Sequence, residues 1–295
     1  MATHVNHHYI PDFLLKTWLS GPDKKLSVFK ILPDGRLRHD RLGSRAVAHE
    51  AHLYSLRRSE SDPDTRIENE FLAKLVDGPA AIAHAQMLKS GLASLTAEQR
   101  DDWARFLVAG LVRIPWMIEQ FRDIGRRELL TQFESMATHA GRPEAAKTML
   151  QPRFKDVLDD HGMETFVKAI RSEKYVRWVN EAAWSLVTLP AKVESTIIGD
   201  APVSYFGELM ENAFALVAPI SPRHLFSCTS NAHYHSLLEG MTPKALLKAT
   251  NKRMVQHAAD YVYAVDQAHR PLIERHLGRG RRLLNEQHSK GAGLS

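Results

Sequence analysis

The apolar residues of this chain follow different periods in different regions. Near the start, Leu26–Leu32 and Arg36–Leu42 are short β-type runs joined by a Pro-Asp-Gly turn, and His52–Leu56 is typical of a third strand. From 65 to 183 the apolar residues recur at helical spacing. After residue 184, short β-type runs return between Pro and Gly turns. The pattern therefore predicts a helical middle between two strand-rich ends.

The second half of the chain completes this prediction. Its β-type runs are Trp184–Leu189, Ser195–Ile198, Phe214–Val217 and His224–Thr229. Thr242-Pro243 opens a long helix that we expect to continue to about Val265, and Pro271 begins a last one. We therefore predict an α+β fold in which a mostly helical middle packs on an antiparallel sheet built from N-terminal and C-terminal strands. We expect one intertwined domain, made of segments 1–58, 65–183, 184–230 and 243–285.

Composition narrows the class of protein. The 295 residues are 44% hydrophobic and 25% charged, which is ordinary globular usage. The single cysteine, Cys228, excludes an internal disulfide and a cysteine-rich zinc site. We find no apolar run of about 20 residues that would span a membrane, and no apolar core of a signal peptide at the start. We therefore expect a soluble cytoplasmic protein without a membrane segment.

The net charge of +5 is concentrated at the C-terminal end, because the chain from Arg270 onward contributes +4 of it. Arg275, Arg279, Arg281 and Arg282 are spaced closely enough to make weak contact with nucleic-acid phosphates. The alternative is a solvated helix end and a frayed terminus. The rest of the chain is nearly neutral, so any such contact is expected to be salt-sensitive and limited to this tail.

Familiar catalytic motifs are absent from the sequence. There is no phosphate-binding glycine loop, no dinucleotide Gly-x-Gly-x-x-Gly, no Gly-x-Ser-x-Gly and no His-Glu-x-x-His. The segment His49-Glu50-Ala51-His52 is one residue too short for the last of these. These absences argue against a nucleotide-hydrolysing motor and a nicotinamide enzyme.

Three polar side chains fall at or near core-facing positions of predicted helices. At about 100° per residue, Glu68 lies in the middle of an apolar face, while Asp77 points away from it. The residues of that face are Ile67, Phe71, Leu72, Leu75 and Val76. Asn251 lies among apolar residues of the late helix, and Arg113 lies at the margin of the central helix, just before a kink expected at Pro115. A core-facing carboxylate is costly unless it is paired, hydrogen-bonded or bound to a metal.

Two interpretations of these residues remain open. In the first, Glu68 pairs with Arg113 and Asn251 ties down loop backbone, so that the network is structural. In the second, the groups converge on a site lined by two loops. One loop carries His7 and His8, which can supply nitrogen ligands or a general base. The other loop carries Asp200 at the end of a predicted strand.

Several short motifs, taken in order, resemble a bacterial domain-of-unknown-function family, number forty-two thirty-eight. The motifs are His7-His8-Tyr9-Ile10-Pro11-x-Phe13-x-Leu15, Val47-Ala48-x-Glu50-x-x-Leu53-Tyr54, Ile67-Glu68 with the acidic Asp77, Arg113-x-Pro115, Gly199-Asp200-Ala201-Pro202-Val203, Pro219-Ile220-Ser221-Pro222, and Asn251 before Tyr261-Val262-Tyr263. The chain departs from the family pattern at Asp12, where Gln is usual, at Gly199 and Ala201, where Ser and Asn are usual, and at Asp77, where Glu is frequent. The resemblance implies a shared set of site residues, and it implies no reaction.

The sequence thus supports two function hypotheses. The first is a metal-assisted hydrolase that acts on a phosphodiester, with a site drawn from His7, His8, Glu68, Arg113, Asp200 and Asn251. Imidazole and carboxylate ligands suit a divalent metal, and Arg113 would hold the phosphate. The alternative is a non-catalytic binding or interaction module in which the same residues form a buried structural network. Convergence of His8, Glu68 and Asp200 in a pocket would favour the enzyme.

Overall fold

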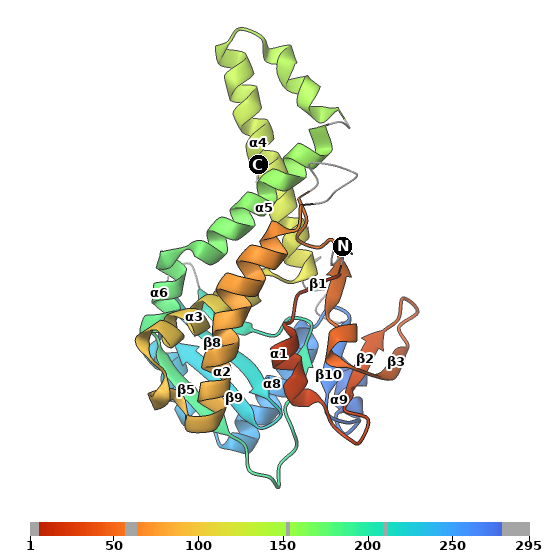
Figure 1. Ribbon diagram of the computed structural model, residues 1–295, viewed down its shortest axis with the longest axis vertical. Helices are drawn as coiled ribbons and strands as arrows, with labels where there is room; N and C mark the ends of the chain where they lie inside the picture. Colours follow the sequence, from red (N-terminus) through yellow and green to blue (C-terminus); the bar gives the residue numbers. More distant parts are fainter. Residues whose placement is uncertain (1–5, 57–63, 152–153, 209–211, 279–295) are drawn as a thin grey trace.

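The computed structural model describes residues 6–56, 64–151, 154–208 and 212–278 (Figure 1). The middle of the chain is helical, as predicted. Its long elements are η3 (Ile67–Asp77), α2 (Gly78–Ser90), α3 (Ala97–Val112), α4 (Pro115–His139), α5 (Lys155–Arg171) and α6 (Glu173–Glu181). Short helical turns are α1 (Asp12–Leu15), η1 (Lys16–Trp18), η2 (Ser44–Ala46), η4 (Leu92–Ser94) and η5 (Pro143–Leu150). The predicted interruption at Pro115 is present, because α3 ends at Val112 and α4 begins at the proline.

The strands form antiparallel sheets, which confirms the α+β class. A small sheet pairs β1 (Asn6–His8) with β4 (His49–Ala51). One four-stranded sheet has the order β3-β2-β10-β6, with β2 (Leu26–Ile31), β3 (Leu37–Leu42), β6 (Ile198–Gly199) and β10 (Tyr261–Ala264). The other has the order β5-β9-β8-β7, with β5 (Ala183–Thr188), β7 (Ser204–Glu208), β8 (Ala213–Ser221) and β9 (His224–Thr229). The sheet β3-β2-β10-β6 combines N-terminal and C-terminal strands, as predicted. The sheet β5-β9-β8-β7 is built from the C-terminal half of the chain alone.

Two predicted elements differ from the structure near the ends of the chain. The late helix α8 (Pro243–His257) stops well before Val265, and Tyr261–Ala264 is the strand β10 between β2 and β6. The alternating Tyr-Val-Tyr run has high strand propensity, and tertiary pairing makes use of it. The third predicted strand at His52–Leu56 is also wrong. Strand β4 lies just before it and ends at Ala51, because the positive φ of 55° at His52 turns the backbone out of the extended region. Helices α7 (Ala232–Glu239) and α9 (Arg270–His276) complete the fold.

Helix η3 is a π-helix, and its geometry overturns the predicted distribution of its faces. The α-helical period places Leu75 in the core and Asp77 opposite Glu68. Instead, Leu75 is 53% exposed and Asp77 contacts Arg113. A π-helix has i→i+5 hydrogen bonds and roughly 4.4 residues per turn, so Glu68 and Asp77 return to the same side after about two turns. The buried residues follow this wider period: Ile67, Phe71, Leu72 and Val76.

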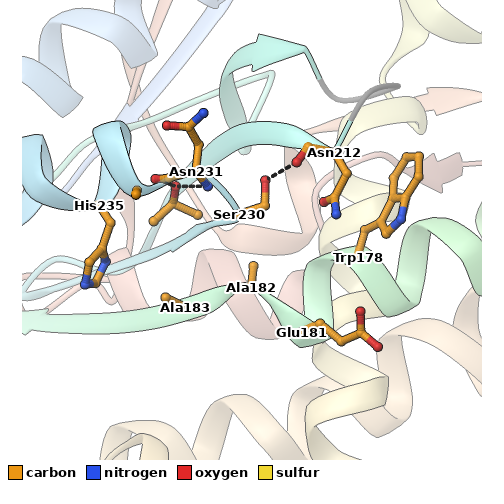
Figure 2. Close-up of a pocket in the computed structure, with 10 residues that line it drawn as sticks. Trp178, Glu181, Ala182, Ala183, Asn212, Ser230, Asn231 and His235 are labelled. Atoms are coloured by element: carbon orange, nitrogen blue, oxygen red, sulfur yellow. Dashed lines mark hydrogen bonds between the residues drawn. The ribbon is translucent and has the colours of Figure 1, made fainter.

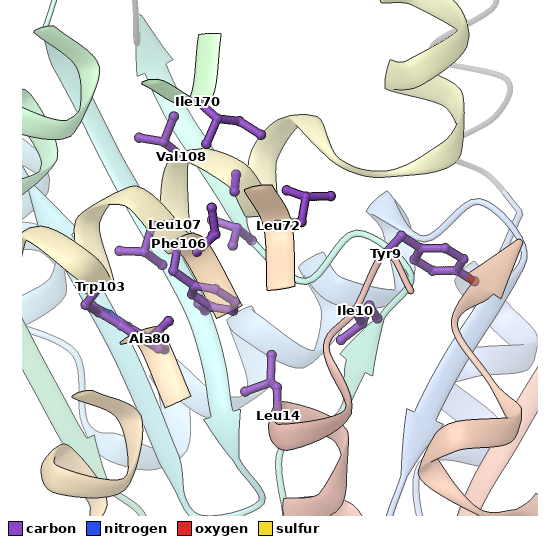
Figure 3. Close-up of a cluster of buried hydrophobic side chains, with 14 of the residues drawn as sticks. Tyr9, Ile10, Leu14, Leu72, Ala80, Trp103, Phe106, Leu107, Val108 and Ile170 are labelled. Atoms are coloured by element: carbon purple, nitrogen blue, oxygen red, sulfur yellow. The ribbon is translucent and has the colours of Figure 1, made fainter. Parts of the chain in front are cut away.

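The main hydrophobic core joins the N-terminal segment to the helices of the middle. Figure 3 shows Ile10 and Leu14 close to the helical side chains Leu72, Phe106 and Leu107. The same cluster of buried residues extends from Tyr9 near the start of the chain to Tyr263 in β10. This continuity agrees with a single intertwined domain, which remains a prediction.

Helices α4 and α5 extend from the body as a paired arm (Figure 1). They pack tightly at two glycines, where a Cβ atom on Gly125 would lie 2.3 Å from the backbone nitrogen of Gly162. The absence of both side chains therefore lets the two helix backbones touch. Within the described residues, none of the helices combines the length and apolar character that crossing a bilayer requires.

Candidate functional site

Arg113 is the centre of a buried polar network at the junction of η3, α3 and β1. It caps the C-terminus of α3 and is fully buried. Its Nη1 donates to Asp77 Oδ1 at 2.6 Å, and its Nη2 donates to Asp77 Oδ2 at 3.1 Å and to the carbonyl oxygen of His8 at 2.8 Å. Burial lowers the pKa of Arg113, but Asp77, together with Tyr54 and Glu68, outweighs burial and keeps that pKa above its ordinary value. The partner of Arg113 in this ion pair is therefore Asp77. The structural interpretation of the sequence had paired Arg113 with Glu68 instead.

Glu68 lies in the same network but is held differently. The backbone N–H of His8 is close enough to its carboxyl group to lower its pKa. Burial nevertheless raises the pKa of Glu68 to about 7, because desolvation and the nearby Asp77 outweigh Arg113 and this N–H group. Its Oε2 atom is buried and has no hydrogen-bond partner among the described residues. Glu68 thus changes its protonation near neutral pH.

His7 and His8 project to opposite faces of strand β1, as neighbouring strand residues do. His7 is fully buried; its Nδ1 accepts a hydrogen bond from the backbone nitrogen of Tyr54 at 3.0 Å, and its ring stacks on the ring of Tyr54. The Tyr54 hydroxyl in turn donates to the carbonyl oxygen of Arg113 at 2.6 Å. The ring of His8 packs edge-on against His49, and burial, followed by His49, lowers the pKa of His8. His8 is therefore neutral at pH 7.

Asp200, which follows β6, binds the backbone of the turn between α8 and β10 with both carboxylate oxygens. Its Oδ1 accepts the backbone N–H of Ala259 at 2.8 Å, and its Oδ2 accepts those of Asp260 at 2.7 Å and Tyr261 at 2.9 Å. Burial raises the pKa of Asp200 to about 6, against the effect of these three N–H groups. This side chain therefore fixes the backbone between the end of α8 and the start of β10.

Asn251 braces the segment that precedes β6. Its Oδ1 accepts the backbone N–H of Ile197 at 3.1 Å, and its Nδ2 donates to the carbonyl oxygen of Ser195 at 3.0 Å. The same carbonyl oxygen lies 2.8 Å from Nε2 of His269. Asn251 therefore ties loop backbone to α8, as the structural interpretation predicted.

The predicted site residues fall into two groups. His7, His8, Glu68 and Arg113 share the network around β1, with Asp77 as a fifth member. Asp200 and Asn251 brace the β6 region. The two regions approach each other at Tyr9 and Tyr263, whose hydroxyl oxygens are 3.3 Å apart, and Asp200 contributes to the raised pKa of Tyr9 after burial and Tyr263. In the described residues, no three His, Cys, Asp or Glu side chains are placed to share a metal ion. A divalent metal does not fit this donor set.

The residues that sequence reasoning missed are Asp77 and Tyr54. Both occur in the motifs that carry the family resemblance, which was the available signal for them. The helical phase concealed Asp77 because it assumed α-helical geometry. Of the basic tail, Arg275 lies in the last turn of α9, and Arg279, Arg281 and Arg282 lie outside the described residues. Nucleic-acid contact by this tail remains a prediction.

Two cavities lie away from the network. One is polar, has a volume of about 430 Å³, and lies between the end of α6, the start of β5, the end of β9 and α7 (Figure 2). Its Ser230 hydroxyl donates to the carbonyl oxygen of Asn212 at 2.7 Å, and Asn231 Oδ1 accepts the backbone N–H of His233, so these groups are already occupied. The other cavity, of about 230 Å³, is apolar and lies against β7, β8, α7 and α8.

Comparison with known proteins gives one match. Residues 6–268 match the family model described as "Protein of unknown function (DUF4238)". The match includes every residue of the β1 network as well as Asp200 and Asn251. No curated protein and no solved structure matches the chain.

Proposed function

The chain belongs to DUF4238, a family of unknown function, and from this premise we propose that it is a non-catalytic binding module whose buried polar residues are structural. One observation supports this proposal above the others. The polar side chains selected from the sequence direct their hydrogen bonds to backbone groups. His7, Arg113, Asp200 and Asn251 each bond a backbone N–H or C=O of an irregular segment or of β1.

The hydrolase hypothesis assigned substrate phosphate to Arg113, and the geometry does not favour that role. The guanidinium is fully buried and is engaged on both Nη atoms by Asp77 and His8. A phosphate would have to displace a bidentate carboxylate, which leaves the partly buried Asp77 without its counter-ion. Arg113 therefore serves to fix β1 against the π-helix.

One observation favours a second candidate function. Glu68 has a pKa of about 7 and a buried Oε2 with no hydrogen-bond partner in the described part of the chain. A carboxyl group with these properties suits general acid–base catalysis. It would take a proton from water as that water attacks the phosphorus of a phosphodiester, and would return the proton to the departing alcohol oxygen as its P–O bond breaks, so that a phosphomonoester and an alcohol form without a metal.

A hydrolysis assay separates the two functions. Purified protein and the Glu68→Gln variant are assayed with a chromogenic phosphodiester from pH 5 to pH 9, with and without a chelator. Glu70→Gln, an exposed carboxylate on the same helix, is the matched control. The binding module predicts no turnover above the buffer rate in any sample. Turnover in the parent and in Glu70→Gln that is lost in Glu68→Gln would establish the catalytic function instead.

A further inference from the structure

The apolar cavity of about 230 Å³ has walls from two structural layers. Strands β7 and β8 supply one wall, where Phe206 lies opposite Ala215 and Ser204 lies opposite Val217 on the same face of the sheet. Helices α7 and α8, with the turn between them, supply the other wall, mainly through Leu237, Leu238, Met241, Leu246 and Met254.

The cavity is open at a rim of exposed apolar side chains. Phe206 is 37% exposed and Leu237 is 52% exposed. Large apolar side chains that border an open apolar cavity are typical of a binding site. A small ligand can therefore enter without unfolding either layer.

Arg253 of α8 contributes the positive charge of this otherwise apolar site. Its Nη2 donates to the carbonyl oxygen of Tyr205 at 3.1 Å, and its guanidinium lies 4.6 Å from the centre of the Phe206 ring. Its Nε is buried and has no hydrogen-bond partner among the described residues, and no ion pair there joins Arg253 to a carboxylate. Burial lowers the pKa of Arg253. The charge is partly desolvated without a counter-ion, which is unfavourable until an anion binds.

A second polar atom of the cavity is also unpartnered. The Oγ of Ser204 is buried and makes no hydrogen bond to any described residue. Near Arg253, His257 is neutral at pH 7 and adds no second positive charge, because burial and then Arg253 lower the pKa of its imidazole to about 4. The site therefore offers a guanidinium and a hydroxyl as donors, in apolar surroundings.

We propose that this cavity binds a small monocarboxylate with an unbranched apolar chain, with the carboxylate at Arg253 and the chain between the β7–β8 sheet and α8. The inference rests on the proposed binding function and gives its ligand class. A cavity of about 230 Å³ holds roughly seven or eight groups of the size of water or methylene, at about 30 Å³ each. Chains of about six to eight carbons fit this volume.

Calorimetric titration of the full chain with hexanoate, octanoate and 1-octanol tests the proposal. Octanoate is expected to bind at least tenfold more tightly than 1-octanol, because only the carboxylate compensates Arg253. Arg253→Gln should weaken octanoate at least tenfold and leave 1-octanol unchanged. Lys252→Gln removes an exposed positive charge from the same helix and should change neither affinity.

A steric variant checks the location of the site. Ala249 lines the cavity from an exposed position on α8, so Ala249→Phe should block entry while the fold is kept. Octanoate affinity that survives Ala249→Phe, equal affinity for octanoate and octanol, or no heat of binding for octanoate would each overturn the proposal. None of these outcomes depends on Glu68. Failure here is therefore distinct from the finding of phosphodiester hydrolysis, which would overturn the proposed function.

Discussion

Arg113 and Arg253 differ in how completely the surrounding residues compensate the charge of the guanidinium group. Arg113 is fully buried, yet it meets a bidentate carboxylate and a backbone carbonyl, and its pKa is raised. Arg253 is partly buried, makes one hydrogen bond to a carbonyl oxygen within the described part of the chain, and has a lowered pKa. The deeper charge is the compensated one. Burial of a charged side chain therefore does not by itself identify a functional residue. The lack of a counter-ion or of hydrogen-bond acceptors for that side chain is a better indication of a binding site.

The largest expected effect comes from Asp77→Asn, which removes the counter-ion of Arg113. We expect a loss of ~3–5 kcal/mol in the free energy of unfolding, because a buried guanidinium is left with a neutral partner. Urea denaturation measures this loss, with Glu70→Gln as the control. A loss below about 1 kcal/mol would mean that water compensates Arg113, and the contrast between the two arginines would fail.

Asp200→Asn tests the same kind of compensation at a second place in the fold. An amide has a single acceptor oxygen, so at least one N–H among Ala259, Asp260 and Tyr261 loses its partner. We expect ~2–3 kcal/mol of destabilisation. Amide exchange in β10 should accelerate more than exchange in α4. Uniform protection in both elements would contradict this role for Asp200.

The stability of the protein should depend on pH through Glu68, because the surrounding residues do not fully compensate the burial of its ionised carboxylate. Its folded-state pKa of about 7 lies above the ordinary value of 4.5, so the fold favours the protonated acid. That contribution is fully present below pH 4.5 and is lost as the pH rises through 7. Glu68→Gln should match the parent near pH 4.5 and be ~1–2 kcal/mol more stable at pH 8, after allowance for partial exposure. Melting curves at both pH values measure this difference, and parallel pH profiles for parent and variant would show that Glu68 ionises normally.

Arg253→Gln is expected to have the smallest effect on stability. Removal of a charge that has no counter-ion should change the free energy of unfolding by less than about 0.5 kcal/mol. Urea denaturation beside Lys252→Gln checks this value. A loss comparable to that of Asp77→Asn would reveal a structural partner for Arg253 and would remove the distinction between the two sites.

Much of the fold could be predicted from local signals. The hairpin of β2 and β3 follows from its Pro-Asp-Gly turn, and the α3–α4 break follows from Pro115. Strand β10 could not be predicted in this way, because no glycine or proline separates it from α8. Its identity depends on pairing with β2 and β6, which are distant in sequence. The two-residue strand β6 carries too little pattern to indicate that pairing.

Within the predicted helices, a site residue was predictable only where it conflicted with its local pattern. Glu68 and Asn251 stood out because each interrupts an apolar face. Asp77 did not stand out, because it lies on the same side as Glu68 only in a π-helix. The sequence pattern did not indicate the wider π-helical period. Arg253 gave no signal, because its environment depends on β7, a strand that the pattern did not predict. Residues whose role depends on a distant element have no local signature.

The pairing of β2 with β10 has a consequence for synthesis of the chain. Lys30 finds its partner Tyr261 only after roughly 230 further residues have been made, which takes roughly ten to fifty seconds at ribosomal speed. During that interval the inner edge of β2 has no permanent neighbour, and its Val28 and Phe29 are apolar. Nascent chains should therefore depend on chaperone binding near this hairpin until β10 leaves the ribosome. A ribosome-bound chain stalled before Tyr261 should be more sensitive to protease at β2 than one stalled well past α9.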